Sequence, residues 1–214
     1  MPRVALLALM LGAVTLVGCG TSNQPSGPTV ASVAVQPGDL PTGMARCDLT
    51  GDIASFIQKE QTPDPQAAKT MSADWQDAKK NGASSAYVAL YTDSNAHCAG
   101  IKTSGADLGA ATYKLVVNFV VQYKDENSAA NAYKSGQPIL GFNPAELRGG
   151  GGGVVEGTRT GLTANSIALT QPAGTQLFYI ALWQNGPFVV ILAVLNVDAN
   201  AAKNVATREN SRIK

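Results

Sequence analysis

The most reactive side chains of this 214-residue chain stand next to each other: His97, its one histidine, and Cys98. A cysteine beside an imidazole can act as a nucleophile, so a catalytic thiol at Cys98 is one hypothesis. Adjacent side chains rarely face each other, however, and Cys47 supplies a second thiol. In an exported protein two such cysteines normally form a disulfide, here around a loop of about 50 residues. We therefore expect a Cys47–Cys98 disulfide, which contributes roughly 4 kcal/mol in the chain-entropy description.

A second pattern with chemical potential is the tetrapeptide Asp-x-Asn-Ala/Ser, which follows three apolar, strand-like runs. Asp and Asn oxygens are calcium ligands, but the third acidic position, the glycine and the distal glutamate of an EF-hand loop are missing. An aspartate between a strand and a helix instead accepts hydrogen bonds from the first backbone N–H groups of the helix. We therefore predict helix caps at Asp93, Asp125 and Asp198.

Other catalytic and cofactor signatures are missing from the sequence. There is no Gly-x-Ser-x-Gly nucleophile elbow, and one histidine beside a bonded cysteine pair leaves no common zinc site. Residues 149–153 are five glycines without the Lys-Ser/Thr of a phosphate-binding loop, which indicates a loose surface loop. The carboxylate pair of a glycosidase depends on tertiary structure, yet acidic and aromatic residues are few. We expect a protein that is not an enzyme and uses no cofactor and no metal.

The charge of the chain is almost balanced, with 16 basic and 15 acidic residues, and only 14% of the residues are charged. Nucleic-acid binding requires a basic surface that neutralises phosphates, and the sequence has no basic cluster. The composition therefore argues against a nucleic-acid partner and leaves Asn, Gln, Ser and Thr as the main solubilising residues.

The N-terminus has the layout of an export signal. Arg3 precedes an apolar run over residues 4–17, which is shorter than the roughly 20 residues that a membrane-spanning helix needs. Leu16-Val17-Gly18-Cys19 resembles the bacterial lipobox. This resemblance implies that residues 1–18 are a signal peptide that is removed and that Cys19 is acylated, with palmitate as one such chain. The protein is then expected on the extracytoplasmic face of a cell membrane, held by its N-terminal lipid.

The residues after the acylation point are polar and rich in Gly, Ser and Pro, a composition that predicts a flexible linker. We assign residues 19–32 to the lipidated N-terminus and linker, and residues 33–214 to one globular domain. A short strand is expected at residues 32–36, where Val33 and Val35 alternate with smaller or polar residues. The Pro- and Gly-containing residues 37–41 then turn the chain.

The periodicity of the remaining chain predicts an α+β fold. Asp64 and Pro65 begin a helix with Trp75 as its core anchor. Strands are expected at residues 86–92, 114–124, 176–184 and 188–196, with Asn185-Gly186 as the hairpin turn between the last two. We predict a single domain with an antiparallel sheet of about five or six strands and helices packed mainly on one face.

Several of these features together resemble uncharacterised secreted lipoproteins of bacteria. The resemblance includes Gly38-Asp39-Leu40-Pro41 ahead of Cys47, the helix that carries Trp75, and Val121-Gln122-Tyr123-Lys124-Asp125-Glu126. The chain is more faintly similar to the extracytoplasmic sensor-like domains of actinobacterial kinases and to PsbP-like lipoproteins. Neither resemblance implies an activity, and no site residue is transferred from either family.

The apolar strands suggest where a ligand could bind. Residues 188–195 are apolar on both faces, so this strand belongs inside the sheet and its second face needs a cover. A small apolar ligand is the first hypothesis for that cover, and the candidate ligand-binding residues are Phe178, Ile180, Leu182, Val190 and Leu192. The alternative for each residue is ordinary core packing. A structural lipoprotein that binds another cell-envelope protein is the second functional hypothesis.

Overall fold

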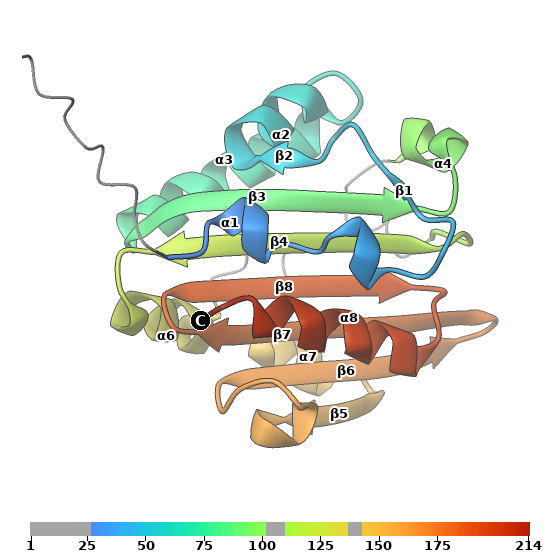
Figure 1. Ribbon diagram of the computed structural model, residues 1–214. Helices are drawn as coiled ribbons and strands as arrows, with labels where there is room; N and C mark the ends of the chain where they lie inside the picture. The colour runs from blue at the N-terminus through green and yellow to red at the C-terminus, as the bar shows by residue number, and fades with distance from the viewer. Residues whose placement is uncertain (1–26, 102–109, 137–142) are drawn as a thin grey trace, which may run out of the picture.

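The computed structural model describes residues 27–101, 110–136 and 143–214, which form an antiparallel sheet of eight strands with helices around it (Figure 1). The strand order is β1-β3-β4-β8-β7-β6-β5, and β2 also pairs with β3. The strands are β1 (Ala45–Arg46), β2 (Gly51–Asp52), β3 (Ala83–Thr92), β4 (Leu115–Tyr123), β5 (Gly153–Glu156), β6 (Ser166–Ala173), β7 (Gln176–Asn185) and β8 (Phe188–Leu195).

The α+β class and the antiparallel sheet agree with the prediction, and the sheet has more strands than the expected five or six. The sheet contains β6, which has eight residues and was not among the predicted strands, and three short strands: β1 and β2 with two residues each and β5 with four. Strands of this length are too short to show the alternation on which a sequence prediction relies. The long strands β4 and β8 pair in the middle of the sheet, where their apolar character on both faces requires them to be.

Helices cover both faces of the sheet. In Figure 1, α1 (Val30–Val33) and α8 (Ala199–Ser211) lie in front of the strands, and α6 (Glu126–Ser135) and α7 (Pro144–Gly149) lie behind them. The face behind, which we call the α2–α3 face, is also covered by α2 (Ile53–Glu60), α3 (Pro65–Lys80) and α4 (Asn95–Gly100). Most helices therefore lie on one face, as expected, while α1 and α8 cover the second, the α8 face. Two short 3-10 helices, η1 (Pro37–Asp39) and η2 (Gly157–Thr160), complete the described elements.

The side chains of β4 show how the alternation of a strand divides the core in two. Leu115, Val117 and Phe119 belong to the hydrophobic cluster on the α2–α3 face, which we call the α2–α3 cluster. Val116 and Val120 belong to the hydrophobic cluster on the α8 face, which we call the α8 cluster. All five are buried. The α8 helix presents a small apolar stripe to its cluster, consisting of Ala202, Val205 and Ala206.

The predicted strand over residues 32–36 is wrong, because α1 occupies the beginning of this segment. Thr29 caps the helix by accepting a hydrogen bond from the Ser32 N–H, and the Ser32 hydroxyl in turn accepts one from the Thr29 N–H. This reciprocal pair is a capping box, in which a local side-chain signal decides in favour of a helical turn. The described chain is therefore already folded from Thr29 onward, and Val33 is fully buried.

The helix caps follow the prediction in two of three cases. Asp125 accepts a hydrogen bond from the Ser128 N–H at 2.7 Å, and Asp198 accepts one from Ala201 at 3.1 Å. The helix after β3 is instead capped by Ser94, which accepts from the His97 N–H at 3.1 Å. Asp93 therefore stands one residue before the cap, and its carboxylate is available to other partners.

Two further details of the prediction need correction. Trp75 is only partly buried and packs at the margin of the α2–α3 cluster, while Ala68, Met71 and Ala78 are the buried residues of α3. The hairpin between β7 and β8 exists as expected, but Asn185 pairs with Phe188, so Gly186 and Pro187 form the turn. Gly186 has the positive φ, 51°, that a two-residue hairpin turn of this kind places on its first residue.

The five glycines of residues 149–153 are not a loose surface loop. Gly149 ends α7 and Gly153 begins β5, so the run makes a tight connection that lies against β6. A Cβ atom on Gly152 would stand 2.7 Å from Leu169 Cδ1 and 2.8 Å from the Thr170 carbonyl oxygen. Glycine is needed here because two backbones approach closely.

Candidate functional site

The structure joins Cys47 and Cys98 in a disulfide, as predicted. The two Cα atoms are 5.1 Å apart, and the bond links the segment after β1 with α4. The Thr92 hydroxyl lies 3.2 Å from the Cys98 sulfur. Because both sulfurs are used in the bridge, Cys98 has no free thiol in this state, and a Cys–His nucleophile cannot form.

His97 is held beside the disulfide by two neighbours of its own. Its Nδ1 lies 2.5 Å from Asp93 Oδ1, and its ring stacks on Tyr113 with centroids 4.2 Å apart and planes 11° from parallel. Asp93 also accepts a hydrogen bond from the Lys114 N–H at 3.2 Å. Desolvation alone would raise the pKa of Asp93, but the hydrogen bonds from His97 and Lys114 outweigh it and lower that pKa. This cluster fixes α4 to the start of β4.

The five predicted ligand-binding residues do not form one surface. Leu182 is buried in the α2–α3 cluster, with Phe178 and Ile180 partly buried at its margin. Val190 and Leu192 are fully buried in the α8 cluster on the opposite face of the sheet. The second face of β8, which was predicted to bind a ligand, is covered by α8 instead.

A surface groove lies instead between α2 and α3. It has a volume of about 400 Å³, and its lining includes Ile57, Pro65, Ala68 and Ala73 together with the exposed Lys69. The lining residues come from α2, from the connection over residues 61–64 and from α3. The remaining lining residues are polar, namely Gln61, Ser72 and Gln76, so the groove combines four apolar residues with three polar ones and one cation.

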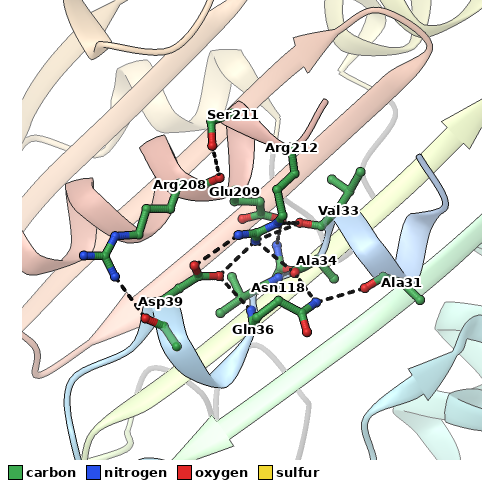
Figure 2. A network of polar contacts seen from close by, with 12 residues as sticks. Ala31, Val33, Ala34, Gln36, Asp39, Asn118, Arg208, Glu209, Ser211 and Arg212 are labelled. Atoms are coloured by element: carbon green, nitrogen blue, oxygen red, sulfur yellow. Dashed lines mark hydrogen bonds and ion pairs between the residues drawn. The ribbon is translucent and has the colours of Figure 1, made fainter. Parts of the chain in front are cut away.

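The second unusual arrangement is a polar network on the α8 face (Figure 2). The segment over residues 29–40, which we call the strap, contains α1 and η1 and crosses β3 and β4 (Figure 1). Arg212, the residue after α8, reaches over the strap and donates hydrogen bonds to the carbonyls of Val33 at 2.9 Å and Ala34 at 3.0 Å. It also pairs with Asp39 at 2.9 Å, and Asp39 accepts the Gln36 N–H at 2.8 Å.

The strap is attached to the rest of the protein without sheet pairing. Within the described ranges, its backbone-to-backbone hydrogen bonds all stay inside the strap. Its contacts with the sheet come from side chains: Asn118 Oδ1 accepts the Val35 N–H at 3.0 Å, and the Tyr91 hydroxyl donates to the Val35 carbonyl at 3.0 Å. We call the side chains that hold the strap the clasp: Asp39, Tyr91, Asn118, Glu209 and Arg212.

Glu209 is the most unusual member of the clasp, because it is a carboxyl group with no exposed surface. Its Oε1 accepts a hydrogen bond from Asn118 Nδ2 at 2.8 Å, and its Oε2 has no hydrogen-bond partner among the described residues. Burial raises the pKa of Glu209 well above its ordinary value, although the hydrogen bond from Asn118 and the charge of Arg212 act in the opposite direction.

Sequence reasoning missed the clasp, although two signals for it are present. Glu209 follows Ala202, Val205 and Ala206 at helical spacing, so it lies on the buried stripe of α8. Asn118 shares the α8 face of β4 with the buried Val116 and Val120. A polar residue at a core position of a helix and another at a core position of a strand indicate that the two could be partners.

No protein-family model matches the sequence, and no curated protein matches it. Among solved structures, the extracellular domain of PknH from Mycobacterium tuberculosis is similar, with a TM-score of 0.49 and 10% sequence identity over 86% of this chain and 94% of that one. This is a distant structural match to the extracellular domain of a mycobacterial kinase, and at this score it carries no argument about function.

The predicted signal peptide over residues 1–18 and the predicted acylation point, Cys19, lie outside the described residues. In the part of the chain that the structure does describe, no helix has the length and apolar character needed to cross a bilayer. The same part contains no cluster of three or more His, Cys, Asp or Glu side chains arranged to hold a metal ion.

Proposed function

We propose that this chain is a lipid-anchored extracytoplasmic module that binds a small apolar ligand and does not catalyse a reaction. The observation that supports the extracytoplasmic location is the Cys47–Cys98 disulfide. Reducing conditions in the cytosol keep thiols free, whereas disulfides persist outside the cell membrane. The lipobox-like Leu16-Val17-Gly18-Cys19 supports the same location, with Cys19 as the acylated residue.

The number of residues between Cys19 and the strap limits how far the domain could lie from the proposed anchor. From Cys19 to Thr29 the chain spans ten peptide steps, so it could reach at most about 35 Å from the bilayer surface to the strap. The domain would then stand close to the membrane, with α1 and η1 as the first described elements after Cys19.

Labelled palmitate and cell fractionation test the anchor. The wild-type chain should incorporate the label and sediment with membranes, and a Cys19→Ser variant should lose the label. A matched Cys98→Ser variant should keep it, because Cys98 belongs to the folded domain. A wild-type chain that remains unlabelled in the cytosol with its leader attached would contradict the anchor.

The binding role is supported by the groove between α2 and α3. Its volume of about 400 Å³ lies within the range of roughly 300–1,000 Å³ that is common for small-molecule sites. Since helices close both sheet faces, this groove replaces the five sheet residues as the place for a small apolar ligand. Lys69 at its edge favours a ligand with an acidic end, such as a long-chain carboxylic acid.

Native mass spectrometry after incubation with a total lipid extract tests this role. The wild-type protein should retain a bound molecule, and Ala73→Trp should abolish binding because the indole fills the groove. Thr70→Trp, an exposed change on α3 outside the groove lining, is the matched control and should bind normally. If neither wild type nor control retains a lipid while crosslinking in intact cells captures one envelope protein, the structural lipoprotein class is favoured instead.

A further inference from the structure

A continuous hydrogen-bond path connects the strap backbone with the buried carboxyl group of Glu209 (Figure 2). The Val35 N–H donates to Asn118 Oδ1 at 3.0 Å, and Asn118 Nδ2 donates to Glu209 Oε1 at 2.8 Å. The same Nδ2 also donates to the Ile191 carbonyl at 3.2 Å. The amide oxygen of Asn118 therefore bonds to the strap and its nitrogen bonds to Glu209, so Val35 and Glu209 share one hydrogen-bonding partner.

The groups near Glu209 compensate a negative charge on it only in part. Arg212 is the nearby cation, but its guanidinium is already used by Asp39 and by the Val33 and Ala34 carbonyls. Asp39 adds a negative charge from η1, and Tyr91 contributes an uncharged hydroxyl from β3. Arg208, the other cation on this part of α8, donates to the Gly38 carbonyl. A carboxyl group enclosed in this way is more stable when it is protonated and neutral than when it is ionised.

Of the elements that cover the α8 face, the strap requires the lowest free energy to open. α8 is fixed by Ala202, Val205 and Ala206, which are buried in the core. The strap contributes three buried residues, Val33, Ala34 and Val35, and it has no sheet ladder to break. Terminal segments without backbone pairing open locally with much lower free energy than the core strands.

We propose that the strap and the clasp form a pH-sensitive latch, which is closed when Glu209 is protonated and is released when Glu209 ionises. Release admits water to the carboxylate and frees the Val35 N–H from Asn118. The direction is fixed by burial, which raises the pKa of Glu209 in the closed form above that in the open form. Higher pH therefore favours the open strap.

The consequence for the cell rests on the proposed lipid anchor. Because the strap lies shortly after Cys19 in the chain, its release adds residues 29–40 to the connection between the anchor and the domain and extends the maximum reach of that connection by about 40 Å. The domain could then reach a partner farther from the membrane at higher pH and would be held close to the membrane at lower pH.

Hydrogen exchange of the Val35 amide, measured by NMR on the full chain in detergent micelles from pH 5 to pH 8, tests the latch. After correction for the intrinsic pH dependence of exchange, protection in the wild type should fall by about tenfold per pH unit between the open-form and closed-form pKa values of Glu209. Core amides of β8 should keep their protection throughout. In Glu209→Gln the side chain stays neutral, so the protection of Val35 should no longer depend on pH.

Glu60→Gln is the matched control, because Glu60 is a second fully buried glutamate, on α2 at the other face of the sheet. It should leave the pH dependence of Val35 intact. Asn118→Ala removes the connecting amide and should lower Val35 protection at every pH. Protection of Val35 that stays constant with pH in the wild type, or falls equally in Glu209→Gln, overturns the latch. Neither result bears on acylation, so a failure of the latch and a failure of the anchor are distinguishable.

Discussion

Asn118 of β4 and Glu209 of α8 are hydrogen-bonded at 2.8 Å across the α8 core, although 91 positions separate them in the chain. Both side chains are fully buried. Each group reduces the desolvation cost of the other, because the amide nitrogen donates and the carboxyl oxygen accepts. The pair connects the central strand, the last helix and the strap, so its properties should be visible in the stability of the whole domain.

We predict that stability falls as pH rises from 5 to 8. The folded-state pKa of Glu209 lies above its ordinary value of 4.5. The contribution of the protonated carboxyl group to stability is therefore complete below pH 4.5 and is lost as the pH rises through the folded-state pKa. Carboxylates whose pKa is lowered, such as Asp52 and Asp125, are already ionised in this window. Glu209→Gln should therefore exceed the wild type at pH 8 by about 1 kcal/mol or more.

Urea unfolding followed by tryptophan fluorescence measures this difference. The variant and the wild type should be closest in stability at pH 5 and diverge toward pH 8. A wild-type protein that gains stability over this range, or a variant with an identical pH profile, would show that Glu209 is accommodated in its charged form.

The disulfide should make a large contribution to stability. Its sequence separation is 51 residues. By the chain-entropy description, its loss costs about 4 kcal/mol. The double variant Cys47→Ala/Cys98→Ala should unfold at much lower urea concentration, and the wild type with reductant should behave in the same way. Peptide mapping under non-reducing conditions checks the pairing, and alkylation of both thiols without prior reduction would refute it.

Gly152 should not tolerate even the single added methyl group of alanine. A Cβ at this position would contact Leu169 at 2.7 Å and the Thr170 carbonyl at 2.8 Å, so β5 would have to move away from β6. We expect Gly152→Ala to cost about 1–3 kcal/mol in the free energy of unfolding. Gly149→Ala is the control, since a Cβ there meets nothing within 4 Å. Equal stability of the two variants would mean that the glycine run is loose after all.

The residues first proposed as ligand contacts should behave as core residues. Leu192 is fully buried, and Leu192→Ala should cost about 2–5 kcal/mol. Phe178 is only partly buried, so Phe178→Ala should cost less. Both variants should still bind lipid in the native mass-spectrometry assay wherever they remain folded. Selective loss of binding with unchanged stability would restore the sheet as the ligand site.

Local signals account for what could be predicted. Helix α3 begins at the predicted Asp64 cap, β4 extends from Leu115 to Tyr123 within the predicted strand, and the β7–β8 hairpin has the expected partners. The errors have local causes as well. At residues 32–36 a Thr29–Ser32 capping box overrode the alternation, and after β3 the cap was taken by Ser94 one residue beyond Asp93. Competing side chains within a few residues decided both cases.

The sequence by itself determined the class of fold, the central position of β8 and the pairing of Cys47 with Cys98, because periodicity and the small number of cysteines constrain them directly. Only the tertiary structure decided which surfaces are open. Phe178 and Val190 lie on opposite faces of the sheet, and α8 together with the strap covers the face of β8 that was predicted to bind a ligand. The clasp forms only in the tertiary structure, since Asp39, Asn118 and Arg212 are distant in sequence. They meet only when the strap and the end of α8 fold onto one face of the sheet.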